Sequence, residues 1–517
     1  MRTFLAATLI ALAVPALAQA PQRGGTLVFS VTGEPDTYDC HATVTTSVAH
    51  RVSPHYSTLL RLNPYDYPKI EGDLAESWEA TQDGLTYTFR LRANVRFHDG
   101  TFLTSADVKA SFERIMNPPQ GVVLHRRAQF RDVSAIDTPD PRTVIFRLAR
   151  ANAAMPVYFA GPLNCIYSAR RLAENPLFPQ RNVMGTGPFR FVEHVAGSEW
   201  RGERFDGYFR PGQPYLDGFR AISVGGPALV NALAGRQIMA DFRGLAPAER
   251  DRVLASRGDS MRVHEADTPG MLMLTFNAER GPTADARVRR ALSIAIDRRA
   301  GAEPMGRLTF FSGVGGFQRP GSEFARDAQE LARQPGFGTD MAANRAEARR
   351  LLAEAGHANL HLTLTNRPLY TALGVFLIDQ WRQVGATVRH EQAENQPYFA
   401  ARSSGNFEII VDAIQDYADE PSLQFLPFLS LARNPANVAR ARDERVDRLY
   451  DLQAFELDRS RRTGYVRELE THLLTEAYTV PLYWAKRIVP LDASIRGYGM
   501  TPSAFVGQDL AGVWLAR

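Results

Sequence analysis

Cysteine and lysine are scarce in this sequence. Among 517 residues there are two cysteines and three lysines, so arginine supplies nearly all of the 60 basic residues. These residues form no basic block interleaved with aromatic side chains, and a nucleic-acid-binding groove is therefore not predicted. The 56 acidic residues almost balance the basic ones, so net charge restricts the class of ligand little.

Catalytic signatures are also missing. The sequence has no Gly-x-Ser-x-Gly elbow, no His-Glu-x-x-His helix and no Cys-x-x-Cys pair. His357 and His361 have the spacing of metal ligands on a helix, but Gly356 ends the predicted helix before them. We therefore predict no catalytic residues, no metal and no cofactor, and a hydrolase is only a distant alternative.

Long apolar runs are confined to the start of the chain. Arg2 gives a positive charge, residues 4–14 are apolar, and Ala16-Leu17-Ala18 suits signal peptidase. We expect residues 1–20 to be a signal peptide, without a cysteine that would carry a lipid anchor. No later run reaches the roughly 18 apolar residues of a membrane span. The expectation is export to a periplasm as a soluble protein.

Residues 71–116 show two clear periodic patterns. Residues 85–91 alternate between apolar and polar, which is typical of a half-buried strand. Thr104 or Ser105 can cap a following helix. Its apolar face would consist of Val108, Phe112 and Ile115.

The same stretch carries four consecutive submotifs, LAESWE, DGLTYTFRLR, VRFHDG and TSADVKASFERI. In this order they resemble the signature block of the extracellular solute-binding proteins of family 5, the dipeptide, oligopeptide and nickel receptors of ABC importers. The resemblance implies an α/β fold, a periplasmic-binding-protein-like two-hinged clamshell (type II, cluster C) with an additional insertion lobe. It also implies a monomer that delivers a small ligand to an inner-membrane permease and its ATPase.

About 500 residues would follow the signal peptide, and this length suggests three domains. The resemblance implies lobe I from residues 21–41, 169–264 and 485–517, lobe II from the insertion 42–168, and lobe III from 265–484. Hinges are then expected near 265 and 485. An isolated cysteine pair in an oxidising compartment favours a disulfide, with two buried thiols as the alternative. Because Cys40 and Cys165 fall near the ends of the insertion, a disulfide would join its base.

Strands and helices alternate in lobe III, which predicts a parallel sheet. Arg367 follows the predicted strand 360–365, and Asp416 follows the predicted strand 407–414. Ligands of such sheets bind beyond the carboxyl ends of the strands. A carboxylate for an ammonium group and a guanidinium for a carboxylate suit a short zwitterion. An ion pair without a ligand role is the alternative.

The family resemblance assigns the same roles to Asp416 and Arg367. Two departures from its pattern, Ala413-Ile414 in place of Gly-Trp and a proline shifted to Pro421, could reshape the pocket. Further candidates for ligand contact are a turn carboxylate, four aromatic side chains and a residue at a strand end, each with solvent exposure or core packing as the alternative. They are Glu34, Tyr38, Tyr370, Tyr417, Trp484 and Asn277. The Gly-rich stretch 301–338 is expected to be an irregular loop over the cleft.

Together these patterns predict a receptor that closes on a ligand and does not transform it. Short peptides are the leading ligand class. Opine-like amino-acid conjugates and nickel held by a small chelator are the alternatives.

Overall fold

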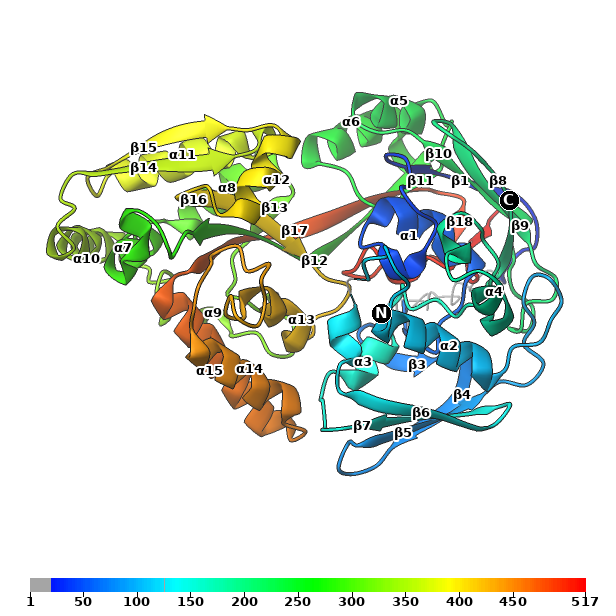
Figure 1. Cartoon of the computed structure of the whole chain (residues 1–517). Coiled ribbons are helices and arrows are strands. Elements are labelled where there is room, and N and C mark those ends of the chain that lie inside the picture. Colours follow the sequence, from blue (N-terminus) through cyan, green and yellow to red (C-terminus); the bar gives the residue numbers. More distant parts are fainter. Residues whose placement is uncertain (1–19, 125) are drawn as a thin grey trace, which may run out of the picture.

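The structure is a computed structural model that describes residues 20–124 and 126–517. Residues 1–19 of the predicted signal peptide therefore lie outside the described part of the chain. Within that part, no helix combines the length and apolar character needed to cross a bilayer. Figure 1 shows two bodies connected by long strands.

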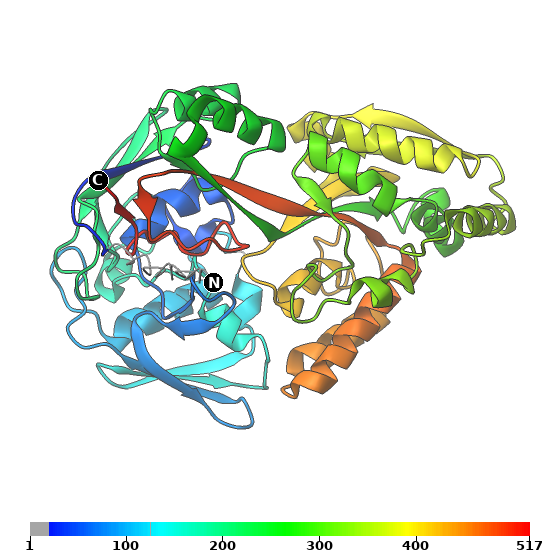
Figure 2. The same cartoon turned by 180° about the vertical axis from the view of Figure 1, so that it is seen from behind.

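One eleven-stranded mixed sheet runs through both bodies. Its order is β15-β14-β16-β12-β17-β11-β1-β10-β9-β8, and β13 pairs with β17. The central strands β12 (Met261–Phe276) and β17 (Thr479–Asp492) are antiparallel partners from one body to the other (Figures 1 and 2). The predicted junctions near 265 and 485 therefore lie inside two continuous strands. The remaining strands of this sheet are β1 (Thr26–Val31), β8 (Phe189–Val195), β9 (Glu199–Arg204), β10 (Gly218–Ser223), β11 (Ala240–Asp241), β13 (Phe311–Gly313), β14 (Leu360–Asn366), β15 (Ala386–Gln392) and β16 (Ile409–Gln415).

A separate four-stranded antiparallel sheet, β4-β5-β7-β6, lies within the range predicted as lobe II. The alternation predicted over 85–91 is confirmed, since Tyr87, Phe89 and Leu91 are buried on one face of β5. The predicted helix is α2 (Ser105–Met116), and its N-terminus is closed by a capping box between Thr104 and Asp107. The strands of this range are β2 (Leu60–Leu62), β3 (Ile70–Gly72), β4 (Ala75–Ala80), β5 (Thr86–Leu91), β6 (Val133–Asp140) and β7 (Thr143–Leu148).

Helices lie along the large sheet, and the four-stranded sheet has helices, including α2, on one side only (Figures 1 and 2). Helix α10 begins at Met341, where the Asp340 side chain caps it by accepting a hydrogen bond from the backbone N–H of Ala343. The other helices are α1 (Thr46–Val52), α3 (Met155–Phe159), α4 (Ala169–Glu174), α5 (Pro227–Ala234), α6 (Pro247–Arg257), α7 (Ala286–Ile294), α8 (Arg298–Leu308), α9 (Ala328–Ala332), α10 (to Glu354), α11 (Thr371–Arg382), α12 (Asn395–Ser404), α13 (Pro421–Phe425), α14 (Glu444–Phe455) and α15 (Arg459–Glu476), and two short strands, β18 (Ile495–Arg496) and β19 (Trp514–Leu515), pair near the end of the chain.

The stretch 301–338 is more regular than the sequence suggested. It contains most of α8, then β13 and α9. Helix propensity is low here, because Gly and Pro disfavour helix interiors, but tertiary contacts override it. A side chain at Gly301 would collide with the Tyr483 hydroxyl, which donates to the Arg298 carbonyl at 3.1 Å. The glycine thus permits close packing of α8 on β17.

The disulfide between Cys40 and Cys165 is confirmed. The two Cα atoms are 6.1 Å apart, and both residues are buried in the core around β1. The bond joins the turn before α1 to the segment after α3, which are the two ends of the predicted insertion.

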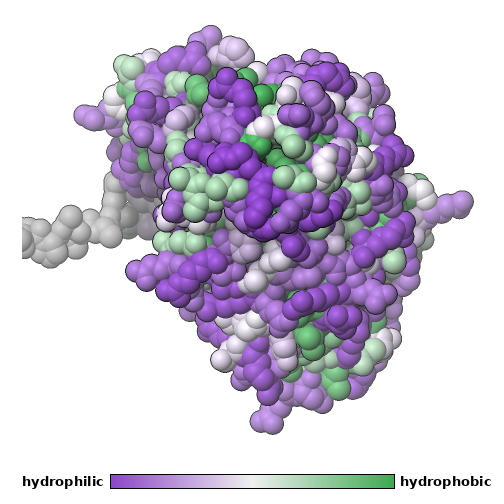
Figure 3. Space-filling view, turned by 90° about the vertical axis from the view of Figure 1, so that its left-hand side faces the viewer, coloured by the Kyte–Doolittle hydropathy of each residue, from purple (hydrophilic) through white to green (hydrophobic). Residues whose placement is uncertain are grey.

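The surface on the side of α10 and β15 is mostly hydrophilic. Hydrophobic groups on this face are small and separated by polar residues (Figure 3). The apolar material of this body lies inside it, in two cores on either side of the large sheet.

Candidate functional site

Strands β14 and β16 are parallel, as predicted, and the structure pairs them directly, with Thr365 opposite Ile410. Their ends are staggered, however. Arg367 lies two residues beyond Thr365, whereas Asp416 lies six residues beyond Ile410, a difference of four residues. At roughly 3.3 Å per residue, the two Cα atoms are about 13 Å apart along the strand direction. Among the described residues, no ion pair joins these two side chains.

Arg367 lies among aromatic rings. Its Nη2 donates to the Tyr370 hydroxyl at 3.1 Å, and its guanidinium carbon is 5.0 Å from the centre of that ring. The rings of Tyr398 and Phe399 are 5.1 and 5.5 Å away. No carboxylate of the described chain pairs with this guanidinium, so its positive charge has no internal counter-ion.

Asp416 lies at the other end of this region, beside the central strand β12. Its backbone N–H donates to the Pro269 carbonyl at 3.1 Å. Although part of the residue is exposed, burial of its carboxyl group raises the pKa to about 7, and the negative charge of Asp419 adds to this rise. No hydrogen bond or ion pair to the carboxyl group occurs within the described residues. Asp416 is therefore an acid that titrates near neutral pH.

Asp419 connects two predicted lobes. It accepts hydrogen bonds from Arg319 at 2.8 and 2.7 Å and from the Tyr67 hydroxyl at 3.1 Å. The backbone N–H of Asp419 also donates to the Tyr67 oxygen at 3.2 Å. Tyr67 belongs to lobe II and Asp419 to lobe III, so these contacts cross the interface. Sequence reasoning did not identify them.

Other contacts between lobes II and III surround this point. The Tyr417 hydroxyl donates to the Val157 carbonyl at 3.4 Å, and the Ala153 N–H donates to the Ala454 carbonyl at 2.8 Å. Ala418 and Leu423 are buried in the same core as the strands of the four-stranded sheet. Tyr417, predicted to contact ligand, thus also contributes to this interface.

Glu34 and Tyr38 lie together in lobe I around His194. Glu34 accepts a hydrogen bond from the Gly197 N–H at 2.7 Å, and its other oxygen is 3.1 Å from His194 Nε2. The Tyr38 hydroxyl is 2.8 Å from His194 Nδ1, and its ring stands edge-on to Trp200. No contact of the described residues connects this pair to Asp416 or Arg367.

Asn277 and Trp484, two further predicted ligand residues, lie in the core. Asn277 is fully buried and donates to the carbonyls of Gly405 and Phe407. Since β12 and β16 are antiparallel, it lies at the opposite end of β16 from Asp416. Trp484 is 2% exposed, and its Nε1 donates to the Gly316 carbonyl at 3.1 Å. Both side chains use their polar atoms within the core.

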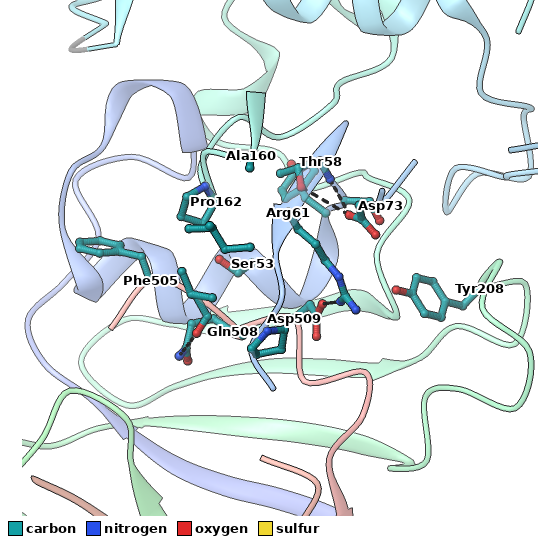
Figure 4. A pocket seen from close by; sticks show the side chains of 16 residues that line it. Ser53, Thr58, Arg61, Asp73, Ala160, Pro162, Tyr208, Phe505, Gln508 and Asp509 are labelled. Atoms are coloured by element: carbon teal, nitrogen blue, oxygen red, sulfur yellow. Dashed lines mark hydrogen bonds and ion pairs between the residues drawn. The ribbon is translucent and has the colours of Figure 1, made fainter. Parts of the chain in front are cut away.

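A small cavity of about 50 Å³ lies elsewhere, between lobe II and the chain near residue 507 (Figure 4). Its charged side chains are neutralised: Arg61 pairs with Glu71 and Asp509, and Asp73 pairs with Arg210. None of the predicted ligand residues lines it. In the described part of the chain, no three His, Cys, Asp or Glu side chains group as metal ligands.

Comparison with characterised proteins gives relatives of one kind. The probable ABC transporter periplasmic-binding protein SapA of Escherichia coli K12 is 26% identical over 528 residues, covering 95% of this chain and 92% of SapA. The glutathione-binding protein GsiB of Salmonella typhi is 26% identical over 324 residues. That match covers 62% of this chain and only 59% of GsiB.

Solved structures show the same fold. The periplasmic binding protein AgaA of A. tumefaciens R10, in complex with agropinic acid, matches with a TM-score of 0.78 at 25% identity, covering 95% of this chain and 99% of AgaA. DppA from Helicobacter pylori, in complex with the peptide STSA, matches with a TM-score of 0.81 at 21% identity, covering 96% and 99%. The profile of the bacterial extracellular solute-binding proteins, family 5 Middle, matches residues 69–435, which is more than half of the sequence. The chain therefore belongs to family 5 of the bacterial extracellular solute-binding proteins.

Proposed function

We propose that this protein is the periplasmic receptor of an ABC importer and captures short peptides between lobes I and III. Membership of family 5 supports the receptor role. The ligand class is inferred from two opposite charges, Asp416 and Arg367, which lie at the ends of neighbouring strands. Among the described residues, neither side chain is paired with an opposite charge. Such a pair suits a molecule with one ammonium and one carboxylate.

The stagger between the two strands favours ligands longer than a dipeptide. An extended dipeptide spans roughly 7 Å between its ends, at about 3.3–3.6 Å per residue. The offset of about 13 Å corresponds to about four extended residues. Asp416 would hold the amino end and Arg367 the carboxyl end.

Closure of the two bodies would provide the signal for transport. A ligand that contacts both bodies binds the closed form preferentially and raises its population. A shift from 1% to 99% closed requires about 5.5 kcal/mol of preferential binding. The closed, monomeric receptor would then dock on an inner-membrane permease that is driven by an ATPase, with the ligand chemically unchanged.

An opine-like ligand is the second candidate. AgaA, the neighbour at 25% identity, was solved with agropinic acid. In addition, Ala413-Ile414 replaces the Gly-Trp pair of the peptide receptors next to Asp416. A compact amino-acid conjugate also carries both charges that the site would bind.

Native mass spectrometry of protein purified from a periplasmic extract without refolding tests the proposal. We expect adducts with a spread of masses that correspond to tri- to pentapeptides and that disappear in Asp416→Ala. A single sharp non-peptide mass would support the opine-like ligand instead. Full retention of the wild-type adducts by Asp416→Ala would contradict the ammonium role of Asp416.

A further inference from the structure

Two consecutive aromatic residues of α12 lie beside Arg367. Tyr398 is fully buried, and its hydroxyl donates to the Val411 carbonyl at 2.6 Å, which fixes the ring against β16. Phe399 is 49% exposed, although it is one of the large apolar residues of this body. With Tyr370 they surround the guanidinium from two separate elements, at 5.0–5.5 Å from the three ring centres. We call these three rings the aromatic box.

The aromatic box leaves the hydrogen-bond donors of Arg367 largely free. An arginine side chain has five N–H donors in a planar fork. The hydrogen bond to Tyr370 uses one of them, and Nε is buried without a partner in the described structure. Stacked rings attract the cation and fix the plane of the fork, but they accept none of its in-plane donors. Arg367 is therefore held in place and can still bind a planar anion.

Asp412 is an acid beside the aromatic box, but it already pairs with another arginine. Asp412 on β16 accepts from Arg402 Nε at 2.6 Å, and the Tyr398 hydroxyl lies 3.4 Å from its other oxygen. Arg402 thus neutralises Asp412, and the charge of Arg367 remains available for a ligand.

The helix that carries two rings of the box lies near lobe I. In both views of the fold, α12 lies at the edge of its body next to α6 (Figures 1 and 2). Burial raises the pKa of Tyr370, while the positive charges of Arg367 and of Arg243 oppose this rise. Arg243 is exposed and follows β11 in lobe I. A positive side chain of lobe I therefore lies within electrostatic reach of the box.

We propose that Phe399, with Tyr398 and Tyr370, positions Arg367 for an anionic group of the ligand, so that Phe399 controls carboxylate recognition through the arginine. This inference rests on the proposed ligand role of Arg367. It assigns Phe399 as a positioning residue, and it explains why a large ring remains half exposed at this edge. A carboxylate end fits the planar fork bidentately.

Isothermal titration with tetra-alanine and with its C-terminal amide tests this assignment. We expect Phe399→Ala to weaken binding of the free acid about three- to tenfold and to leave binding of the amide unchanged. In an Arg367→Ala background, Phe399→Ala should have no further effect on either ligand. Phe102→Ala is the matched control, because Phe102 is 51% exposed and stacks on Arg96 at 3.9 Å in lobe II.

Equal losses for the acid and the amide, or a loss that persists without Arg367, would overturn the proposal, because Phe399 would then act independently of the arginine. If wild type binds neither tetra-alanine nor its amide, the peptide proposal fails. The effect of Phe399 on Arg367 is then tested in ligand-free protein. For this we would follow phenylglyoxal modification of Arg367 by peptide mass spectrometry, with the exposed Arg382 as internal reference. Faster modification in Phe399→Ala supports the box, and an unchanged rate refutes it.

Discussion

At the scale of single residues, three aspartates of β16 and the following turn differ in their partners. Asp412 pairs with Arg402 and Asp419 pairs with Arg319, both at hydrogen-bond distance. Asp416, between them in sequence, has no such partner in the described structure, and its pKa is raised to about 7. The sequence DAIQDYAD thus contains one acid that can respond to ligand and pH, and only the three-dimensional contacts distinguish it from the other two.

Peptide binding should therefore depend on pH. Only the ionised Asp416 attracts an ammonium group, so affinity for tetra-alanine should fall about tenfold for each pH unit below 7. Above about pH 8 the peptide's own amino group loses its proton, and affinity should fall again. Titration calorimetry between pH 5 and 9 measures this profile. A flat profile in wild type would contradict the role of Asp416.

Ionisation of the Asp416 carboxyl group should raise peptide affinity but lower the stability of the fold. Its folded-state pKa of about 7 exceeds the value near 3.9 of an unfolded aspartate, so stability is lost as pH rises through this window. Asp416→Asn cannot ionise and should raise Tm relative to wild type at pH 8. At pH 4 the two proteins should melt together. Differential scanning calorimetry at both pH values checks this, and a lower Tm for the variant at pH 8 would contradict it.

At the scale of elements, the disulfide fixes the base of lobe II. It closes a loop of 125 residues between the turn before α1 and the segment after α3. A link of this kind restricts the unfolded chain and typically contributes about 2–4 kcal/mol.

Replacing both cysteines, Cys40→Ser with Cys165→Ser, should lower the free energy of unfolding by about 2–4 kcal/mol. Urea denaturation of the oxidised wild type and of the double variant gives the difference. Treatment with a reductant is the control, because it should destabilise wild type and leave the double variant unchanged. Equal midpoints for the oxidised wild type and the double variant would show that the bond contributes nothing.

The sequence predicted elements well where the pattern was local. Short-range sequence patterns predicted the alternation of Tyr87, Phe89 and Leu91 and the cap of α2. They also predicted the parallel direction of β14 and β16. The stagger of strand ends depends on register, which no local pattern specifies. The sequence also cannot specify the contacts of Trp484, because an aromatic residue next to a predicted hinge has the same sequence signal whether it contacts ligand or the loop at Gly316. Phe399 and Tyr67 were missed because their partners lie far away along the chain.

At the scale of the whole molecule, the predicted lobe II contacts the opposite body. Tyr67 contacts Asp419 from one body to the other, and further contacts at Val157 and Ala153 bring α3 against α13 and α14. Asp419 is also a source of the raised pKa of Asp416. The contact between the two bodies and the pKa of the proposed ligand-binding acid thus both involve Asp419.

Tyr67→Phe should favour the open form, because it removes the hydroxyl that both donates to and accepts from Asp419. Small-angle X-ray scattering of ligand-free protein should show a larger radius of gyration, and peptide affinity should fall a few-fold. Tyr65→Phe is the control, since the Tyr65 hydroxyl donates to the Gly497 carbonyl and not to lobe III. An unchanged radius for Tyr67→Phe would exclude a role of this contact in closure.

The central position of β17 has a consequence for the order of folding. This strand begins only after 478 residues of the chain, yet it lies between β12 and β11 in the middle of the shared sheet. Until it is synthesised, neither half of the sheet can complete its hydrogen bonding, and such long-range pairing folds slowly. A nascent chain therefore exposes unpaired strand edges for most of its synthesis. If the predicted signal peptide directs export, this delay would favour translocation of the chain before it folds.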